Sequence, residues 1–154
     1  KVLFKEYIQD YVSKHVSVEW ASNETFYMFG DLNPNDWQES LFDDYVLPPF
    51  AVSHDRLALS FGVGAHQSGV QWHVHGPVWA ETFHGAKRWL LLPPTEEPKF
   101  NPDRSSLQYL LEEFPTSDLR DNIVRCTLKE GELLWIPDQW WHLTLNIGET
   151  VFMP

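Results

Sequence analysis

The chain has 154 residues, of which 43% are hydrophobic and 15% aromatic, a composition that favours a densely packed domain over a disordered chain. Its formal net charge of -11 argues against binding to DNA or RNA, because such binding needs clustered lysine and arginine to displace phosphate counterions. The single cysteine, Cys126, excludes both an internal disulfide and a cysteine-based zinc cluster. No apolar run approaches the roughly 20 residues that a membrane span requires. We therefore expect one domain over residues 1–154, with no nucleic-acid partner and no membrane span.

The N-terminal third of the sequence predicts helices that cover the outside of this domain. Apolar residues recur near helical spacing over residues 2–14, and the stretch 35–45 also predicts a short helix. We interpret residues 1–45 as a helical cover. Between the two helices, Asn23 begins a match to the acceptor pattern for N-linked glycans, a short pattern that chance also produces.

From about residue 57 to residue 154 the sequence predicts a β core. A helix with leucines on one face is expected to interrupt it at about 105–114. The turn signal within residues 128–137 predicts a hairpin. Short antiparallel strands with peripheral helices indicate a jelly roll or barrel, whose mouth would hold a small ligand. The β-rich runs, which Gly, Pro or acidic turns separate, cover 56–64, 78–85, 86–94, 123–137 and 140–153.

Three histidines have the spacing of a metal site. In an extended segment His73 and His75 point to one face, so one strand can supply two ligands. His142 can supply a third from a distant strand, if the two strands face each other across a barrel. Three imidazoles with open coordination positions suit a catalytic iron, zinc, copper or nickel ion. The spacing alone leaves a second interpretation open, in which these residues only form hydrogen bonds at a barrel mouth.

The order of three separated motifs resembles the jumonji C (JmjC) domain family. The motifs are GSGVQWHVHG, GAKRWLLLPP and GELLWIPDQWWHLTLN, and the resemblance runs from about residue 26 to the end of the chain. The segments FYMFGD, PPF and HVHGP resemble those of the jumonji domain-containing protein 8 group most. The resemblance implies a mainly β fold, the cupin-like double-stranded β-helix or jelly roll, and the activity of an oxygenase that depends on iron(II) and 2-oxoglutarate.

The family's site residues are carried over to this sequence position by position. The resemblance implies that His73, His75 and His142 bind the metal, and that Lys87 pairs with the distal carboxylate of 2-oxoglutarate. Two positions depart from the family pattern. His75 stands where the family has an acidic ligand, and Val70 stands where it often has a hydroxyl that also holds the carboxylate. With three neutral ligands the iron site would carry a charge of about +2 instead of about +1, and zinc or nickel could replace iron.

Other polar and aromatic residues around the motifs have two interpretations each. Asn146 shares a face with His142 and could orient the co-substrate or satisfy backbone groups. Glu81 is the acidic residue closest in sequence to the histidine pair and could supply the missing carboxylate, or it could be a solvated strand residue. Trp140 and Trp141 could form an aromatic cage for a cation, or they could pack in the core and rim.

Two functions remain open at this point. The first is an oxygenase that acts on a protein or a small molecule, with iron(II) on the three histidines and Lys87 on an acidic co-substrate. The second is a catalytically inactive JmjC-like scaffold or protein-interaction module, which the departures at His75 and Val70 favour. The resemblance also implies a location in the endoplasmic reticulum lumen or secretory pathway, with the cytoplasm as the alternative.

Overall fold

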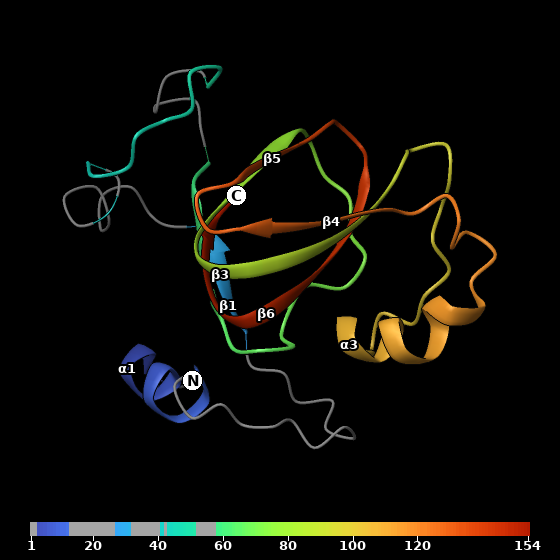
Figure 1. Ribbon diagram of the computed structural model, residues 1–154, viewed down its shortest axis with the longest axis horizontal. Coiled ribbons are helices and arrows are strands. Elements are labelled where there is room, and N and C mark those ends of the chain that lie inside the picture. The colour runs from blue at the N-terminus through green and yellow to red at the C-terminus, as the bar shows by residue number, and fades with distance from the viewer. Residues whose placement is uncertain (1–2, 13–26, 32–40, 42, 52–57) are drawn as a thin grey trace.

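The mainly β architecture that the sequence predicts is present in the computed structural model (Figure 1). The strands form one antiparallel sheet in the order β1-β2-β6-β3-β4, with β5 paired to β3. The structure describes residues 3–12, 27–31, 41, 43–51 and 58–154. The strands are β1 (Tyr27–Asp31), β2 (Ser60–Gly64), β3 (Val78–Leu92), β4 (Val124–Lys129), β5 (Leu133–Ile136) and β6 (Trp141–Met153).

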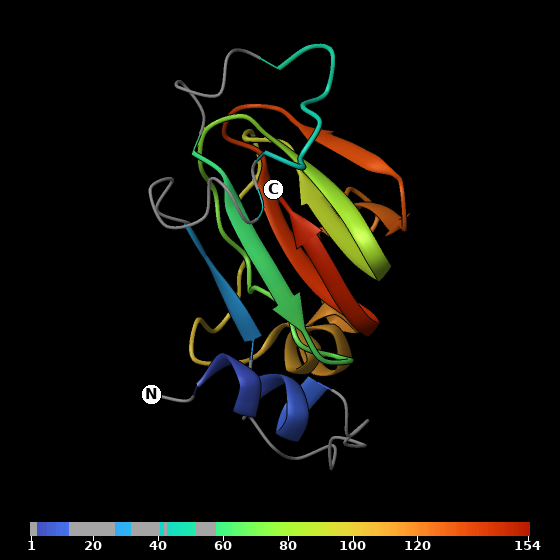
Figure 2. The same ribbon diagram turned by 90° about the vertical axis from the view of Figure 1, so that its left-hand side faces the viewer.

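Strands β3 and β6 are the longest elements and form the centre of the sheet, as Figure 2 shows. The sequence analysis expected two strands separated at Gly85, and this expectation was wrong. The chain continues through Gly85 as one strand of 15 residues, with irregular pairing to β6 between Thr82 and Ala86. Gly85 adopts a φ of 75°, which glycine tolerates at no steric cost, so the strand bends there without ending.

The predicted hairpin within residues 128–137 is absent. Strands β4 and β5 each pair with β3, and both run antiparallel to it, so they follow one another along the same edge. The turn between them includes Gly131, whose N–H donates to the carbonyl oxygen of Thr82 on β3 at 2.8 Å. The turn signal was therefore real, but it produces an interruption in an edge strand instead of a reversal of direction.

In the described part of the chain, two runs of helical turns lie at the periphery. The first comprises α1 (Phe4–Tyr7) and the π-helical η1 (Ile8–Val12), and the Tyr7 hydroxyl donates to the carbonyl oxygen of Val63 on β2 at 2.9 Å. The second comprises α3 (Ser106–Gln108), η4 (Tyr109–Glu113) and η5 (Phe114–Thr116), which agrees with the helix expected at 105–114.

The first segment agrees with the helix expected over residues 2–14, as far as residue 12. Most of the helix expected at 35–45 lies outside the described residues, as do Asn23, His15 and His54. Among the described residues, no helix is both long and apolar enough to cross a bilayer.

The run Trp89–Leu92 on β3 is buried on both faces of the sheet. Leu90 and Leu92 pack with Tyr109 of the helical insert, whereas Trp89 and Leu91 pack on the opposite, inner side. Since side chains alternate along a strand, Lys87 shares the inner side with Trp89. On β6, the register places His142, Thr144 and Asn146 opposite Leu91, Trp89 and Lys87 respectively. The central strands thus direct their polar residues to the inner side of the sheet.

Candidate metal centre

Trp72 fixes the direction of the first histidine. Its indole is buried and packs edge-on against Tyr109 of the helical insert, with ring centroids 5.8 Å apart. The next residue, His73, therefore points to the opposite face, as the sequence predicts. The His73 N–H donates to the His142 carbonyl at 3.0 Å, and the His142 N–H donates to the His73 carbonyl at 2.9 Å. The third histidine was expected on a strand across a barrel, but the backbones of His73 and His142 are direct neighbours.

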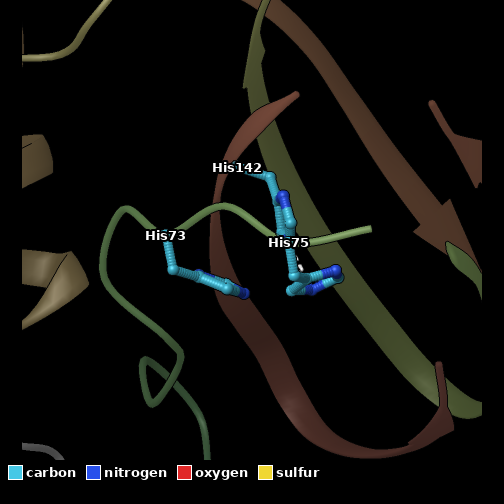
Figure 3. A group of neighbouring side chains, drawn as sticks. All are labelled: His73, His75 and His142. Carbon is cyan, nitrogen blue, oxygen red and sulfur yellow. Dashed lines mark hydrogen bonds between the residues drawn. The ribbon is translucent and has the colours of Figure 1, made fainter. Parts of the chain in front are cut away.

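The three imidazoles converge, as Figure 3 shows. One ligand atom from each of His73, His75 and His142 lies within 4.8 Å of the other two. The ring centroid of His142 lies 4.0 Å from that of His73 and 4.6 Å from that of His75. His142 is buried, His73 is partly buried and His75 is exposed, so the group opens to solvent on the His75 side.

Hydrogen bonds to backbone carbonyls assign the same tautomer to all three rings. The Nδ1 atoms of His73, His75 and His142 lie 2.8, 2.8 and 2.9 Å from the carbonyl oxygens of Gln71, Gly76 and Trp140. A carbonyl oxygen only accepts, so each Nδ1 carries a proton. In the neutral rings the Nε2 lone pairs are then available to a metal. Such partners of the second nitrogen orient metal-binding histidines and raise their basicity.

The Nε2 atoms of His75 and His142 are 3.1 Å apart. With both Nδ1 atoms protonated, two lone pairs face each other across this distance, which is repulsive unless a proton or a cation lies between them. A metal at about 2.0–2.1 Å from each nitrogen would separate two ligands by about 2.8–3.4 Å for ligand–metal–ligand angles between about 90° and the tetrahedral angle. The observed separation therefore fits two ligands of one divalent ion.

Burial keeps two of the histidines neutral. The pKa of His142 is lowered to about 3, mainly by desolvation and also by the neighbouring His73 and His75, against an opposing hydrogen bond to the Trp140 carbonyl. Desolvation is also the main reason that the pKa of His73 is lowered. Neutral imidazole is the form that binds metals. The buried part of the site is thus ready for a cation at physiological pH.

Lys87 is buried on the same inner side of the sheet, with only 1% of its surface exposed. Its Nζ donates to the Tyr27 hydroxyl at 2.9 Å and to the Asn146 side-chain oxygen at 3.0 Å. It also lies 3.7 Å from the centroid of the Phe152 ring. Desolvation lowers its pKa well below the usual value. No acidic partner of Lys87 is found among the described residues, so its charge lacks the compensation that buried cations ordinarily have.

One cavity of about 410 Å³ connects Lys87 to the three histidines. The described residues that line it include no Asp or Glu. Hydroxyl groups of Tyr27, Ser60 and Thr144 also line it, and sequence reasoning had given none of them a role. Thr144 was expected on the strand face of His142, whereas Tyr27 lies 60 positions before Lys87 and in no recognisable spacing with it. The cavity therefore has metal ligands at one part and a cation with hydroxyl groups at another.

A comparison with protein families identifies the family of the chain and with it the fold. The family profile described as "JmjC domain, hydroxylase" matches residues 60–153, which is more than half of the chain. The chain belongs to the JmjC domain family. Its antiparallel sheet is accordingly the jelly-roll, double-stranded β-helix of that family, as the sequence analysis expected.

Relatives of known name place the chain within the JmjC family. It is 41% identical to JmjC domain-containing protein 8 of Mus musculus and 39% identical to that of Homo sapiens, each over 97% of this chain. These matches cover 55% and 56% of the two relatives, so the chain spans about half their length. It is 34% identical to the lysine-specific demethylase JMJ21 of Arabidopsis thaliana, over 81% of this chain and 14% of that protein. A cupin superfamily protein from Desulfitobacterium hafniense has 11% identity and a TM-score of 0.45, over 86% of this chain and 77% of that one.

The two positions expected to depart from the JmjC pattern, Val70 and His75, differ in whether a neighbouring side chain supplies the missing group. Val70 has no side-chain hydroxyl, but its backbone N–H donates to Thr144 Oγ1 at 3.1 Å, which brings a hydroxyl to the same part of the cavity. No substitute exists for the acidic ligand among the described residues around the histidines. Glu81, the candidate from the sequence, accepts a hydrogen bond from the Tyr45 hydroxyl at 3.1 Å and does not belong to the histidine group.

The remaining histidines and aromatic residues lie outside the histidine group. His66 accepts from the Gly148 N–H at 2.9 Å in a turn, and His84 is exposed within β3, where the sequence analysis expected a strand end. Trp140 and Trp141 are partly buried against the two core clusters and do not line the cavity, so the structure favours packing over a cage.

Proposed function

We propose that this chain is a metal-dependent oxygenase of the JmjC type, with iron(II) on its three histidines and 2-oxoglutarate as co-substrate. One observation carries the proposal: a single cavity joins three converging Nε2 atoms to a buried lysine that lacks an acidic partner among the described residues. A cation site and an anion site in one cavity match a metal and an acidic co-substrate that binds beside it.

His73, His75 and His142 would hold the metal. Their tautomers, the lowered pKa of His73 and of His142, and the 3.1 Å separation between two Nε2 atoms all suit a divalent ion. Three protein ligands leave open positions for small molecules, which distinguishes a catalytic site from a closed structural one. With iron(II) bound, such a site would supply dioxygen chemistry, in which 2-oxoglutarate is decarboxylated to succinate and CO2, one oxygen atom of dioxygen entering succinate and the other hydroxylating the substrate.

Lys87 and Tyr27 would hold the distal carboxylate of the co-substrate. The Tyr27 hydroxyl accepts from Lys87, so its own proton is left to donate to an anion. Desolvation raises the pKa of Tyr27 well above 10, so the phenol keeps that proton. Thr144 Oγ1 accepts from Val70 and likewise retains a proton to donate. Asn146 orients the Lys87 ammonium through its side-chain oxygen, and Ser68 in turn accepts from Asn146 Nδ2 at 3.0 Å.

Charge favours a dianion in this cavity. Three neutral ligands leave a divalent metal with its full charge of about +2, to which a protonated Lys87 adds about +1. A dicarboxylate compensates most of this charge. Since no Asp or Glu is found among the described lining residues, the co-substrate would be the main source of negative charge in the cavity.

A second function has one observation in its favour, the missing acidic ligand at His75. A neutral ligand attracts the metal less than a carboxylate does, so the site could bind metal too weakly or with the wrong redox preference for catalysis. In that case the chain would be a catalytically inactive scaffold or protein-interaction module that retains the JmjC fold.

Anaerobic titration with iron(II) and then 2-oxoglutarate separates the two functions. The oxygenase requires a visible charge-transfer band when both are present, and conversion of 2-oxoglutarate to succinate after oxygen is admitted. Stoichiometric iron without a band or succinate would favour the scaffold, as would a failure to bind iron at all. A Lys87→Met variant is the matched control, because it should keep the iron and lose the band.

We also propose a location in the endoplasmic reticulum lumen or secretory pathway, on the resemblance to the JmjC domain-containing protein 8 group. The glycan acceptor pattern at Asn23 supports this location. Glycosidase treatment of the natively expressed protein tests it. A mobility shift that an Asn23→Gln variant lacks is the expected result, and an unshifted wild-type protein would favour the cytoplasm.

A further inference from the structure

Three aromatic rings meet on the outer surface of the sheet. Trp79 on β3 and Trp135 on β5 are cross-strand partners, and the third ring, Phe50, belongs to the segment 43–51. The Phe50 ring is nearly perpendicular to both, at 82° and 6.0 Å from Trp79 and at 81° and 5.7 Å from Trp135, between centroids. Phe50 is 55% exposed and Trp135 is 50% exposed. We call this group the aromatic corner.

The aromatic corner lies on the opposite side of β3 from the metal centre. Val78 lines the cavity and Ala80 is buried in the inner core cluster, so the side chain between them, Trp79, points outward. A ligand on the corner therefore contacts a different surface from a ligand in the cavity.

Hydrogen bonds hold the base of the corner in place. The Trp79 indole N–H donates to the Tyr45 hydroxyl at 3.1 Å, and that hydroxyl donates to a Glu81 carboxylate oxygen at 3.1 Å. Burial raises the pKa of Tyr45 to about 12, so the hydroxyl keeps the proton that it donates. These contacts fix the Trp79 ring and place a carboxylate next to the corner. The ring faces are thus organised before any ligand binds, which lowers the entropic cost of binding.

The three segments that form the corner are acidic. Residues 43–51, 78–86 and 130–136 carry five acidic side chains and no lysine or arginine, in a chain with a net charge of -11. The five are Asp43, Asp44, Glu81, Glu130 and Glu132. An apolar surface with this charge attracts a ligand that is both flat and positive. Exposed apolar groups bordered by charges are typical of interaction sites.

We propose that the aromatic corner binds an arginine side chain of a partner protein. Aromatic faces attract cations through their ring quadrupoles, and the attraction is strongest for Trp. Guanidinium is planar, stacks on aromatic rings and is more weakly hydrated than ammonium. It therefore suits the perpendicular faces of Phe50 and the two tryptophans better than the ammonium group of lysine does. The negative charge of Glu81 and its neighbours adds to this attraction. The site is independent of the proposed oxygenase activity, and a scaffold could use it equally.

Titration with a matched pair of peptides tests the proposal, with the tryptophan indole N–H signals followed by NMR on the full chain. The first peptide is acetyl-Gly-Gly-Arg-Gly-Gly-amide, and in the second citrulline replaces arginine, which removes the charge and keeps the shape. The arginine peptide should shift the Trp135 signal in a saturable manner, with at least about threefold higher affinity than the citrulline peptide. Equal binding of the two peptides, or no response at Trp135, would overturn the proposal.

Variants distinguish the corner from other surfaces. Trp135→Leu, at an exposed position, should weaken binding of the arginine peptide by about 3- to 30-fold, as monitored at the remaining indoles, and Trp135→Phe should recover part of the affinity. Leu111→Ala removes an equally exposed apolar side chain from the helical insert and should have no effect. His75→Ala should also leave binding of the arginine peptide unchanged, because His75 lines the cavity and the corner lies on the opposite side of β3. Loss of binding in His75→Ala with retention in Trp135→Leu would assign the peptide to the cavity and refute the corner.

Discussion

The backbones of His73 and His142 exchange two hydrogen bonds, at 3.0 and 2.9 Å, although the residues are 69 positions apart. Residues that form such a pair direct their side chains to the same face of a sheet. The two imidazoles are therefore set 4.0 Å apart by strand register alone. A slip of one residue in this pairing would turn one ring to the opposite face. The pairing thus fixes the positions of two of the three candidate ligands, whereas the third, His75, is exposed and takes no part in this pairing.

Substitutions at His75 should have opposite effects on metal binding. His75→Ala removes one of three ligands and should lower iron(II) affinity by at least about tenfold, whereas His75→Asp restores a carboxylate and should raise it. Thermal melts with and without iron(II) measure this, because a ligand that binds only the folded state raises the melting temperature. The expected result is a larger metal-dependent rise for His75→Asp than for the wild type.

The same melts contain the result that contradicts a metal site. If the histidines only pack and form hydrogen bonds, a carboxylate at position 75 gains nothing from iron(II). His75→Asp would then melt at the same temperature with and without the metal. His66→Ala is the control for unspecific metal binding, since His66 lies outside the group and should leave the metal response unchanged.

Lys87→Met should weaken binding of the acidic co-substrate strongly and preserve the metal. Methionine has nearly the length of lysine without its charge, so the cavity keeps its shape. A hydrogen bond from a charged donor contributes about 1.5–3 kcal/mol, and its loss should lower 2-oxoglutarate affinity by about 10- to 150-fold. Tyr27→Phe removes a neutral donor and should cost less, about two- to tenfold. Isothermal titration of the metal-loaded protein measures both.

The neighbouring residue provides a matched control for this experiment. Arg88 points away from the cavity and donates to the Thr127 hydroxyl at 2.8 Å. Arg88→Met changes the net charge by the same amount as Lys87→Met, so it reports any effect of overall charge. Equal losses in the two variants would show that Lys87 does not contact the anion.

The predictable parts of this protein were those in which a short pattern determines geometry. The spacing of His73 and His75 and the alternation along β6 were enough to bring three ligands and Asn146 to one face. The inward direction of Lys87 was implied by the resemblance to the JmjC family, and 1% exposure agrees with it. Helical periodicity likewise predicted a helix at about 105–114, and the structure has helical turns over 106–116.

The parts that sequence reasoning missed depend on long-range pairing. A glycine with positive φ is compatible with a turn or with a bulge, and only the partner strand β6 determined that Gly85 bends one strand. The turn at Gly131 has the same ambiguity, which pairing of β4 and β5 to β3 resolves. Tyr27 reaches Lys87 from 60 positions away through β1 and β2, and no local pattern encodes that contact.

Acid should destabilise the metal-free protein through His142. Its pKa is about 3 in the folded state and about 6.5 in an unfolded chain. Above pH 6.5 both states are neutral and the residue has no effect. Between pH 6.5 and about pH 3, His142 binds a proton in the unfolded state but not in the folded state. The free energy of unfolding therefore falls by up to about 1.4 kcal/mol for each pH unit in this range. His73, whose pKa is also lowered, acts in the same direction.

Urea unfolding between pH 7.5 and 4.5, with a chelator present, measures this dependence. Carboxylates contribute a background that a His142→Asn variant shares, so the difference between the two proteins isolates His142. The variant should lose less stability between pH 6.5 and 4.5 than the wild type does. Parallel curves for the two proteins would mean that His142 titrates alike in both states.

Gly62→Ala should disturb the proposed anion site around Lys87 by displacing the Phe152 ring. Gly62 and Phe152 are cross-strand partners on β2 and β6, and a Cβ at position 62 would overlap the Phe152 ring. That ring lies 3.7 Å from Lys87 Nζ, so it has to move within the lining of the cavity. Overpacking of this kind costs about 1–3 kcal/mol, which chemical denaturation measures, and 2-oxoglutarate affinity should fall with it.

Gly30→Ala on β1 is the control, because no described atom lies within 4 Å of the added Cβ. The free energy of unfolding of this variant should differ from that of the wild type by no more than about 1 kcal/mol. If Gly62→Ala binds the anion as the wild type does while losing stability, the Phe152 ring acts in packing alone and the cavity tolerates its displacement.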